Sequence, residues 1–258
     1  MKSASFLALL AVTSAWLATS VPARASETDD RIVSSAKKSY VFKTYLKDDS
    51  IKTESRDGAV LLTGTVEDDF HSSLAQDTVE GLPGVKSVNN QLRVRRNRPA
   101  AHTDSWLVVK VKSALLFHRN VSATGTEISV RQGVATLHGE ASSAAQSELT
   151  AEYVRDVDGI KDVKNEMTIA KGTPRATDTL DDKMDDASIT AQVKASLLAH
   201  RSTSAVRTKI ETTDGVVIVS GVAKNAAEKS LVTKLVNDIN GVDSVVNNMT
   251  FAVPVAAN

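Results

Sequence analysis

A fixed spacing of three glycines and one asparagine occurs three times in this chain, and it constrains the fold more than any other feature. The spacing is G-x5-G-x19-G-x5-N, and its positions are Gly58, Gly64, Gly84, Asn90; Gly133, Gly139, Gly159, Asn165; and Gly215, Gly221, Gly241, Asn247. The second copy follows the first by 75 residues, and the third follows the second by 82. Stacked solenoids have shorter periods of about 20–50 residues. The longer period predicts a small autonomous domain that is used three times.

The copies align without insertions, so their boundaries can be stated. The expected modules are residues 29–95, 104–170 and 186–252. The linker 96–103 is short, which predicts contact between the first two modules. The linker 171–185 is longer, polar and acidic, which predicts a more loosely attached third module.

Residues 1–25 have the pattern of a secretory signal peptide. Lys2 supplies the positive start, Phe6–Leu17 the apolar stretch, and Ala23-Arg24-Ala25 a cleavage site of small residues. The apolar stretch is too short to span a bilayer. We therefore expect cleavage after Ala25 and a periplasmic location.

Composition excludes several functional classes. The chain has no cysteine, so disulfides, thiolate nucleophiles and cysteine-ligated metals are excluded. Its 31 basic and 31 acidic residues give zero net charge. That balance argues against a nucleic-acid partner, because such proteins carry a clear basic excess.

The third copy shows the expected order of elements most clearly. Ile189–Leu198 has helical apolar spacing, and Asp214-Gly215 separates two β-rich runs as in a hairpin. Asn225-x-x-Glu228 predicts the capping box of a second helix, and Asn240-Gly241 predicts its end. A last strand is expected over Val242–Phe251. The fold class is therefore α+β: three tandem α-β-β-α-β modules, each a three-stranded mixed sheet with two helices on one face.

The repeated glycines and asparagine have structural interpretations. The first glycine of each copy is expected in the hairpin turn, and the third at the end of the second helix. The second lies inside a strand, which predicts a bulge or a close approach by a helix. The asparagine is expected to bond to local backbone, with a functional role as the alternative.

These features resemble the BON domain family, whose pattern is an α-β-β-α-β module with three glycines placed in this way. The resemblance extends to the terminal strands, which begin Val85-x-x-Val88-x-Asn90, Ile160-x-x-Val163-x-Asn165 and Val242-x-x-Val245-x-Asn247. It covers essentially the whole chain after residue 25. Exported members usually have two modules, whereas this chain has three. The resemblance implies phospholipid or envelope association under osmotic stress and a non-catalytic role.

No catalytic or metal-binding motif is present. HExxH, P-loop and G-x-S-x-G sequences are absent, so we expect neither an enzyme nor a cofactor. His118-Arg119 and His200-Arg201 occupy equivalent positions at the end of the first helix. They could bind an anionic headgroup or complement the helix dipole, and the second interpretation is favoured. Arg93, Arg95, Arg96 and Arg98 could likewise meet anionic lipid or form a solvated strand end.

Equivalent positions that differ between copies are the best candidates for function. In the second copy Leu107, Val111 and Leu115 face the core, and the opposite side of the helix is also apolar. The candidate contact residues are Trp106, Val109, Lys110, Lys112, Leu116, Phe117, His118 and Arg119. An apolar face with aromatic and lysine residues fits a headgroup boundary. Burial against the first module is an equally weighted alternative.

The sequence therefore predicts a periplasmic, non-catalytic envelope protein of three BON-like modules. Its expected partner is an anionic phospholipid surface, which it contacts peripherally under osmotic stress. A periplasmic chaperone, or a scaffold for envelope proteins, is the alternative.

Overall fold

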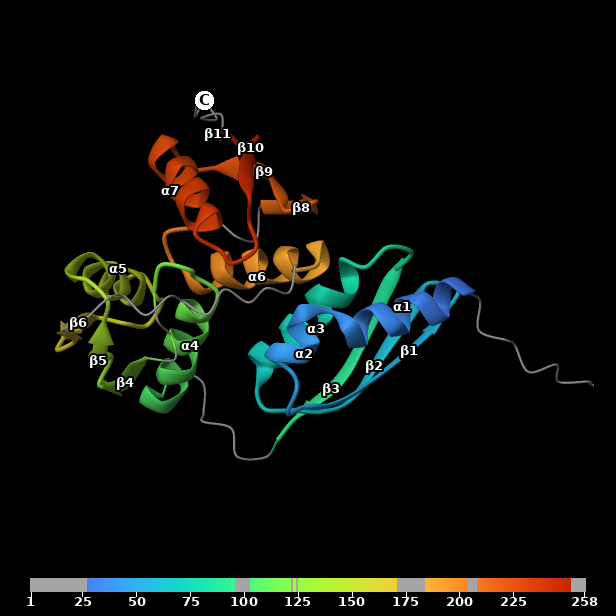
Figure 1. Cartoon of the computed structure of the whole chain (residues 1–258), viewed down its shortest axis with the longest axis horizontal. Coiled ribbons are helices and arrows are strands. Elements are labelled where there is room, and N and C mark those ends of the chain that lie inside the picture. Colours follow the sequence, from blue (N-terminus) through green and yellow to red (C-terminus); the bar gives the residue numbers. More distant parts are fainter. Residues whose placement is uncertain are drawn as a thin grey trace, which may run out of the picture.

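The computed structural model describes residues 27–95, 103–121, 123, 125–170, 184–203 and 208–251. Within them the predicted fold class is confirmed: three small mixed sheets, each covered by helices, follow one another along the chain (Figure 1). The expected signal peptide at 1–25 and most of both linkers lie outside the described residues.

The first module has a continuous three-stranded sheet. Its elements are α1 (Glu27–Lys38), α2 (Tyr40–Thr44), β1 (Ser50–Arg56), β2 (Ala59–Val66), α3 (Asp69–Glu80) and β3 (Ser87–Val94). β2 lies in the middle, antiparallel to β1 and parallel to β3. Buried residues alternate along β2, so one face of the sheet meets the helices, as expected.

The other two modules repeat this topology with one difference. The second consists of α4 (Asp104–Leu116), β4 (Thr126–Arg131), β5 (Val134–Ala141), α5 (Ala144–Arg155), β6 (Asp162–Asn165) and β7 (Thr168–Ile169). The third consists of α6 (Asp186–Ala199), β8 (Thr208–Thr213), β9 (Val216–Ala223), α7 (Ala226–Asn237), β10 (Ser244–Asn247) and β11 (Thr250–Phe251). The single last strand predicted over Val242–Phe251 is thus two short strands, both parallel to β9.

The first helix of module one is interrupted at Ser39, which the sequence did not indicate. The Ser39 hydroxyl donates to the Ala36 carbonyl and accepts from the Phe42 amide, so it ends α1 and caps α2. The break turns Val41 into the interior, where it is fully buried.

The hairpin turn of each module is held by the aspartate that begins its first helix. In module one the Asp29 carboxylate accepts from the amides of Asp57 and Gly58, which both have positive φ (53° and 81°). Two central residues with positive φ match the twist of a tight hairpin. Asp104 and Asp186 make the same pair of bonds in their modules.

The repeated asparagine joins the last strand to the second helix. Asn247 donates to the Lys229 carbonyl and the Thr233 hydroxyl, and accepts from the Met249 amide. Asn90 and Asn165 make equivalent bonds to Ser72 and Ser147.

The second helices begin as predicted but end earlier than expected. The Glu228 amide donates to the Asn225 side chain at the start of α7. α7 ends at Asn237, and the Asp238 amide that follows is shared between the Lys234 and Leu235 carbonyls of the last turn. Gly241 lies in the following turn, where a Cβ would come 3.1 Å from Ile189 of α6. This glycine therefore allows the turn to pack on the first helix.

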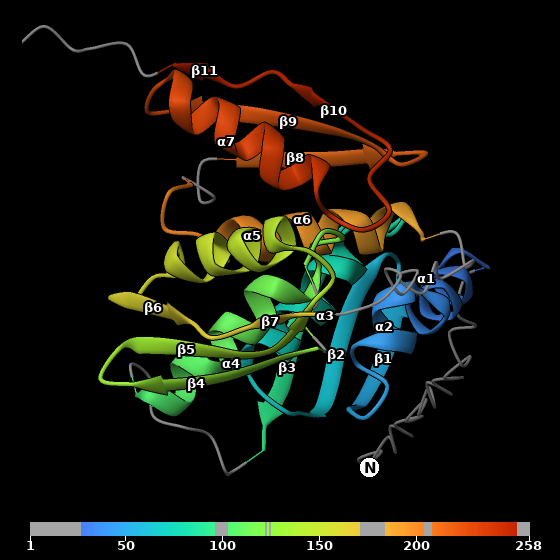
Figure 2. The same cartoon turned by 60° about the vertical axis from the view of Figure 1, so that its left-hand side comes forward.

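The three modules meet around α6. Figures 1 and 2 show this helix in the middle of the molecule, between its own module and the helices of the other two. Ten residues of α6 are buried, including Ala187, Ser188 and Ala191 on the side away from its own core. Module three is thus not loosely attached, and the expectation from linker length was wrong. Small side chains let α3 approach closely: a Cβ on Gly81 would lie 3.1 Å from Ala187.

Candidate functional site: the two ends of helix α4

Helix α4 is anchored by a conventional apolar stripe. The Thr103 hydroxyl caps its start by accepting from the Trp106 amide at 3.3 Å. Leu107, Val111 and Leu115 are buried in the core of module two. This anchoring fixes which side chains of α4 point away from the core.

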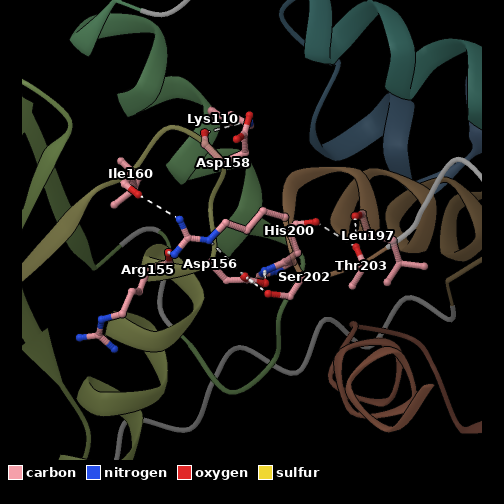
Figure 3. Close-up of polar contacts among 10 residues, drawn as sticks. Lys110, Arg155, Asp156, Asp158, Ile160, Leu197, His200, Ser202 and Thr203 are labelled. Atoms are coloured by element: carbon pink, nitrogen blue, oxygen red, sulfur yellow. Dashed lines mark hydrogen bonds and ion pairs between the residues drawn. The ribbon is translucent and has the colours of Figure 1, made fainter. Parts of the chain in front are cut away.

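The amino-terminal half of α4 presents four of the eight candidate residues at the surface of module two. Trp106, Val109 and Lys110 are half-buried, and Lys112 is exposed. The Lys110 ammonium lies 5.0 Å from the centre of the Trp106 ring, within cation–π range. It also bonds to the Asp158 carbonyl and carboxylate at 3.0 and 3.1 Å (Figure 3). The half-buried indole therefore has one lysine beside it, Lys110, whose charge is paired with Asp158, and Lys112 is exposed on the same helix.

The carboxy-terminal end of α4 lies inside the protein. Phe117 is fully buried, with its ring 5.2 Å from Tyr45 and 5.7 Å from Phe70 of module one. Leu116 packs on the same cluster. The expectation that the whole outer face of α4 is available to lipid is thus wrong for this end. The alternative expectation, burial against module one, holds for Leu116 and Phe117.

His118 and His200 pair modules two and three reciprocally. His118 Nδ1 lies 3.1 Å from the Asp238 carboxylate, which follows α7. His200 Nδ1 lies 3.1 Å from the Asp156 carboxylate, which follows α5 (Figure 3). Both histidines are 2% exposed. Each module therefore gives a histidine to its neighbour's aspartate and receives one in return.

The neighbouring arginines extend this reciprocal contact. Arg119 donates to the carbonyls of Ile239 and Val242 at 2.5 and 2.6 Å. Arg201 donates to the carbonyls of Arg155 and Ile160 at 2.6 and 3.3 Å. The favoured interpretation, complementing their own helix dipole, is thus incomplete, because both arginines satisfy carbonyls at or beyond the end of the second helix of the other module.

Module one carries neither half of this contact. At the positions equivalent to His118, Arg119 and Asp156 it has Lys43, Thr44 and Gly81. Modules two and three thus have both the histidine and the aspartate, and module one has neither. The sequence gives no sign that they pair, because each aspartate is far from its histidine along the chain and has the position of an ordinary helix end. Module one instead meets α6 through its backbone: the amides of Tyr40 and Val41 donate to Asp185 and Ser188.

Two side chains make the paired contact asymmetric. The Tyr153 hydroxyl donates to the Asp238 carboxylate at 2.7 Å, and Ser196 Oγ lies 3.0 Å from His118 Nε2. His200 Nε2 is buried without a hydrogen-bond partner among the described residues. Burial lowers the pKa of His118, although the bond to Asp238 acts in the opposite direction. Burial alone would raise the pKa of Asp156, but the bonds from His200 and Ser202 outweigh it and lower that pKa.

The remaining titratable candidates do not gather into a reactive site. No group of three metal-ligating side chains occurs among the residues that the structure describes. His138 is exposed and lies 3.5 Å from Glu166. Arg95 bonds to the Asp48 carbonyl at 2.7 Å, while Arg96 and Arg98 lie outside the described residues. Within the described part of the chain, no helix is long and apolar enough to cross a bilayer.

Comparison with known proteins gives matches along the whole repeat region. The sequence profile of the BON domain matches residues 28–96, 103–171 and 185–253. Osmotically-inducible protein Y of Escherichia coli (strain K12) is 31% identical over 146 residues, which cover 57% of this chain and 71% of that protein. The 21 kDa hemolysin of Actinobacillus pleuropneumoniae is 31% identical over 125 residues, 45% of this chain and 64% of that protein. Outer membrane lipoprotein DolP of Haemophilus influenzae matches with the same identity and coverage.

Proposed function

The chain belongs to the BON domain family, and we propose that it is a non-catalytic periplasmic protein that binds phospholipid surfaces peripherally and protects the envelope under osmotic stress. The names of two relatives support an envelope role, since one is osmotically inducible and another is an outer membrane lipoprotein. The proposed contact is the amino-terminal half of α4.

The proposal rests on a comparison of equivalent positions in α1, α4 and α6, the first helices of the three modules. In α4 the positions hold Trp106, Val109 and Lys112 at the surface. In α6 the equivalent of Trp106 is Ser188, which is buried and bonded to module one. In α1 it is Arg31, which is exposed and polar. Only α4 combines an aromatic side chain, an aliphatic one and lysines there.

This combination has the chemistry of an interfacial contact. An indole and an aliphatic side chain favour the boundary between headgroups and acyl chains, and lysines favour anionic headgroups. Each lysine near a charged surface contributes about 1 kcal/mol, and the contribution falls within a Debye length. Binding should therefore need anionic lipid and weaken with salt.

Flotation with vesicles tests the proposal. The chain from Ser26 onward should float with vesicles that contain phosphatidylglycerol and remain behind with pure phosphatidylcholine. Trp106→Ala and Lys112→Glu should each reduce the floated fraction several-fold. Lys37→Glu, the matched change in module one, should leave it unchanged. Equal flotation of the folded Trp106→Ala protein would reject this site.

A second surface favours the alternative of a chaperone or protein-interaction scaffold. The outer face of the third sheet carries Val216, Ile218 and Val222 on β9, and Val246 beside Ile218 is 44% exposed. The equivalents of Ile218 and Val246 in module two are the polar residues Thr136 and Lys164. An uncovered apolar sheet face is a typical protein-binding surface.

Replacing apolar residues on this face of the third sheet with the polar residues that module two has there distinguishes the two functions. Ile218→Thr combined with Val246→Lys should leave vesicle flotation intact. If scaffolding is the main activity, the same protein should lose its ability to suppress aggregation of an unfolded client, and the α4 variants should keep it.

A further inference from the structure

The contact between modules two and three contains two buried histidines close together. The ring centres of His118 and His200 are 5.7 Å apart, and the Tyr153 ring lies 4.2 and 5.5 Å from them. Each histidine faces a carboxylate of the other module. We propose that this cluster is a proton-operated latch, closed while both histidines are neutral and opened when both take up protons. The latch consists of His118, His200, Tyr153, Asp156 and Asp238.

The charges around the latch balance only when the histidines are neutral. Asp156 and Asp238 supply two negative charges. The contact also holds two positive ones: Arg201 lies 3.7 Å from Asp156, and Arg119 donates to the carbonyls of Ile239 and Val242, which follow Asp238 in the chain. Tyr153 stays protonated, because burial raises its pKa well above the ordinary value. Arg155, the other cation packed nearby on α5, is already paired with Glu152. Two added protons would therefore leave an excess of positive charge in a buried contact.

The hydrogen bonds also fit neutral imidazoles better than charged ones. With Nδ1 donating to a carboxylate, the Nε2 of each neutral ring is an acceptor. His118 Nε2 then accepts from the Ser196 hydroxyl, and His200 Nε2 lacks a donor among the described residues. A proton on His200 Nε2 would create a buried N–H without an acceptor, near a second cationic ring. Such a group is costly to bury.

The direction of the pH dependence follows from linkage. Burial lowers the pKa of His118 in the docked state below the ordinary value of 6.5. Separated modules would therefore bind more protons than docked ones as the pH falls. Docking is fully stabilised above the ordinary histidine pKa and is lost as the pH falls below it. The opened form would expose the apolar surface around Tyr153 and Ile239.

Distance measurement between spin labels tests the latch directly. The chain lacks cysteine, so Glu148→Cys and Ser230→Cys place two unique labels on exposed, equivalent positions of α5 and α7. At about pH 7.5 one short distance should dominate, and near pH 5 a longer population should appear reversibly. Its midpoint should coincide with the imidazole titration of His118 followed by NMR. An unchanged distance distribution, or a midpoint that differs from the His118 titration, would overturn the proposal.

Matched substitutions identify the groups responsible. His118→Asn together with His200→Asn keeps an N–H donor near each carboxylate but cannot take up a proton, so the short distance should persist near pH 5. His138→Asn changes an exposed histidine and should leave the opening intact. If the double asparagine variant is closed at neutral pH and still opens in acid, the histidines are not the switch. If it is open at neutral pH, the NMR comparison in the unsubstituted chain decides.

Discussion

Asp29 illustrates how one repeated side chain organises a module. It is 3% exposed and accepts hydrogen bonds from Ser55, Asp57 and Gly58, so it ties the start of α1 to the hairpin between β1 and β2. Its carboxylate replaces the water that would otherwise bind two turn amides. A residue at a helix start thus fixes the position of the helix on its sheet.

Replacing Asp29 should destabilise the protein without affecting a binding surface. Asp29→Ala removes charge-assisted bonds to two backbone amides, and we expect a loss of about 2 kcal/mol in the free energy of unfolding, measured by urea titration. Asp30→Ala, next to it but exposed, should cost about 0.5 kcal/mol through the helix dipole alone. Equal effects of the two changes would contradict the assigned contact.

For single residues, the sequence indicated which positions are important but not which contacts their side chains make. The aligned aspartates were visible, but their bonds depend on a turn 28 residues away in the chain. His118 and His200 were singled out, and their partners Asp238 and Asp156 were not, because contacts across 120 and 44 residues leave no local pattern. Phe117 could equally face lipid or protein, since a sequence shows apolarity but not what covers it.

Helix α6 shows what a single element contributes to the assembly. Leu197 is 2% exposed and packs in the core, whereas its neighbour Leu198 is 57% exposed. Ala187, Ser188 and Ala191 occupy the side that receives module one. The helix is therefore covered by all three modules and open only along the strip that carries Leu198.

A pair of adjacent substitutions checks this orientation of α6. Leu197→Ala should lower the free energy of unfolding by about 3 kcal/mol, because it leaves a cavity in a packed core. Leu198→Ala should change it by less than about 0.5 kcal/mol. Comparable losses in thermal or urea unfolding would mean that the helix is rotated from the position described.

Elements with strong local signals were predicted well. The hairpin turns and the amino-terminal caps of the second helices follow from a few adjacent residues, and they lie where the sequence placed them. The break at Ser39 and the division of the last strand at Asn247 were missed. The break at Ser39 goes with a tertiary contact, since the Val41 amide donates to Ser188 of α6. At the division of the last strand, the Met249 amide donates to the Asn247 side chain.

The whole molecule is held together by two different kinds of contact. Modules two and three meet through the reciprocal bonds of His118, His200 and their aspartates. Module one docks through helix packing on α6 and through the ion pair between Lys194 and Asp77 at 3.2 Å. The linker lengths gave the wrong expectation for module three, because surface complementarity determines docking.

Removing both latch carboxylates should separate modules two and three while leaving each folded. Asp156→Ala with Asp238→Ala deprives His118, His200 and Tyr153 of their acceptors. We expect a larger radius of gyration in small-angle X-ray scattering, with unchanged far-ultraviolet circular dichroism. Asp243→Ala, an exposed change in module three, should alter neither measurement. A compact double variant would show that these carboxylates do not hold the modules together.

The emission of Trp106 tests the proposed function most directly, since no other tryptophan follows residue 25. The chain from Ser26 onward should show a blue shift with phosphatidylglycerol vesicles, and lipids brominated along the acyl chain should quench the emission. Pure phosphatidylcholine vesicles should produce neither effect. Protein that floats with anionic vesicles while its Trp106 emission stays unshifted and unquenched would contradict a lipid contact on α4.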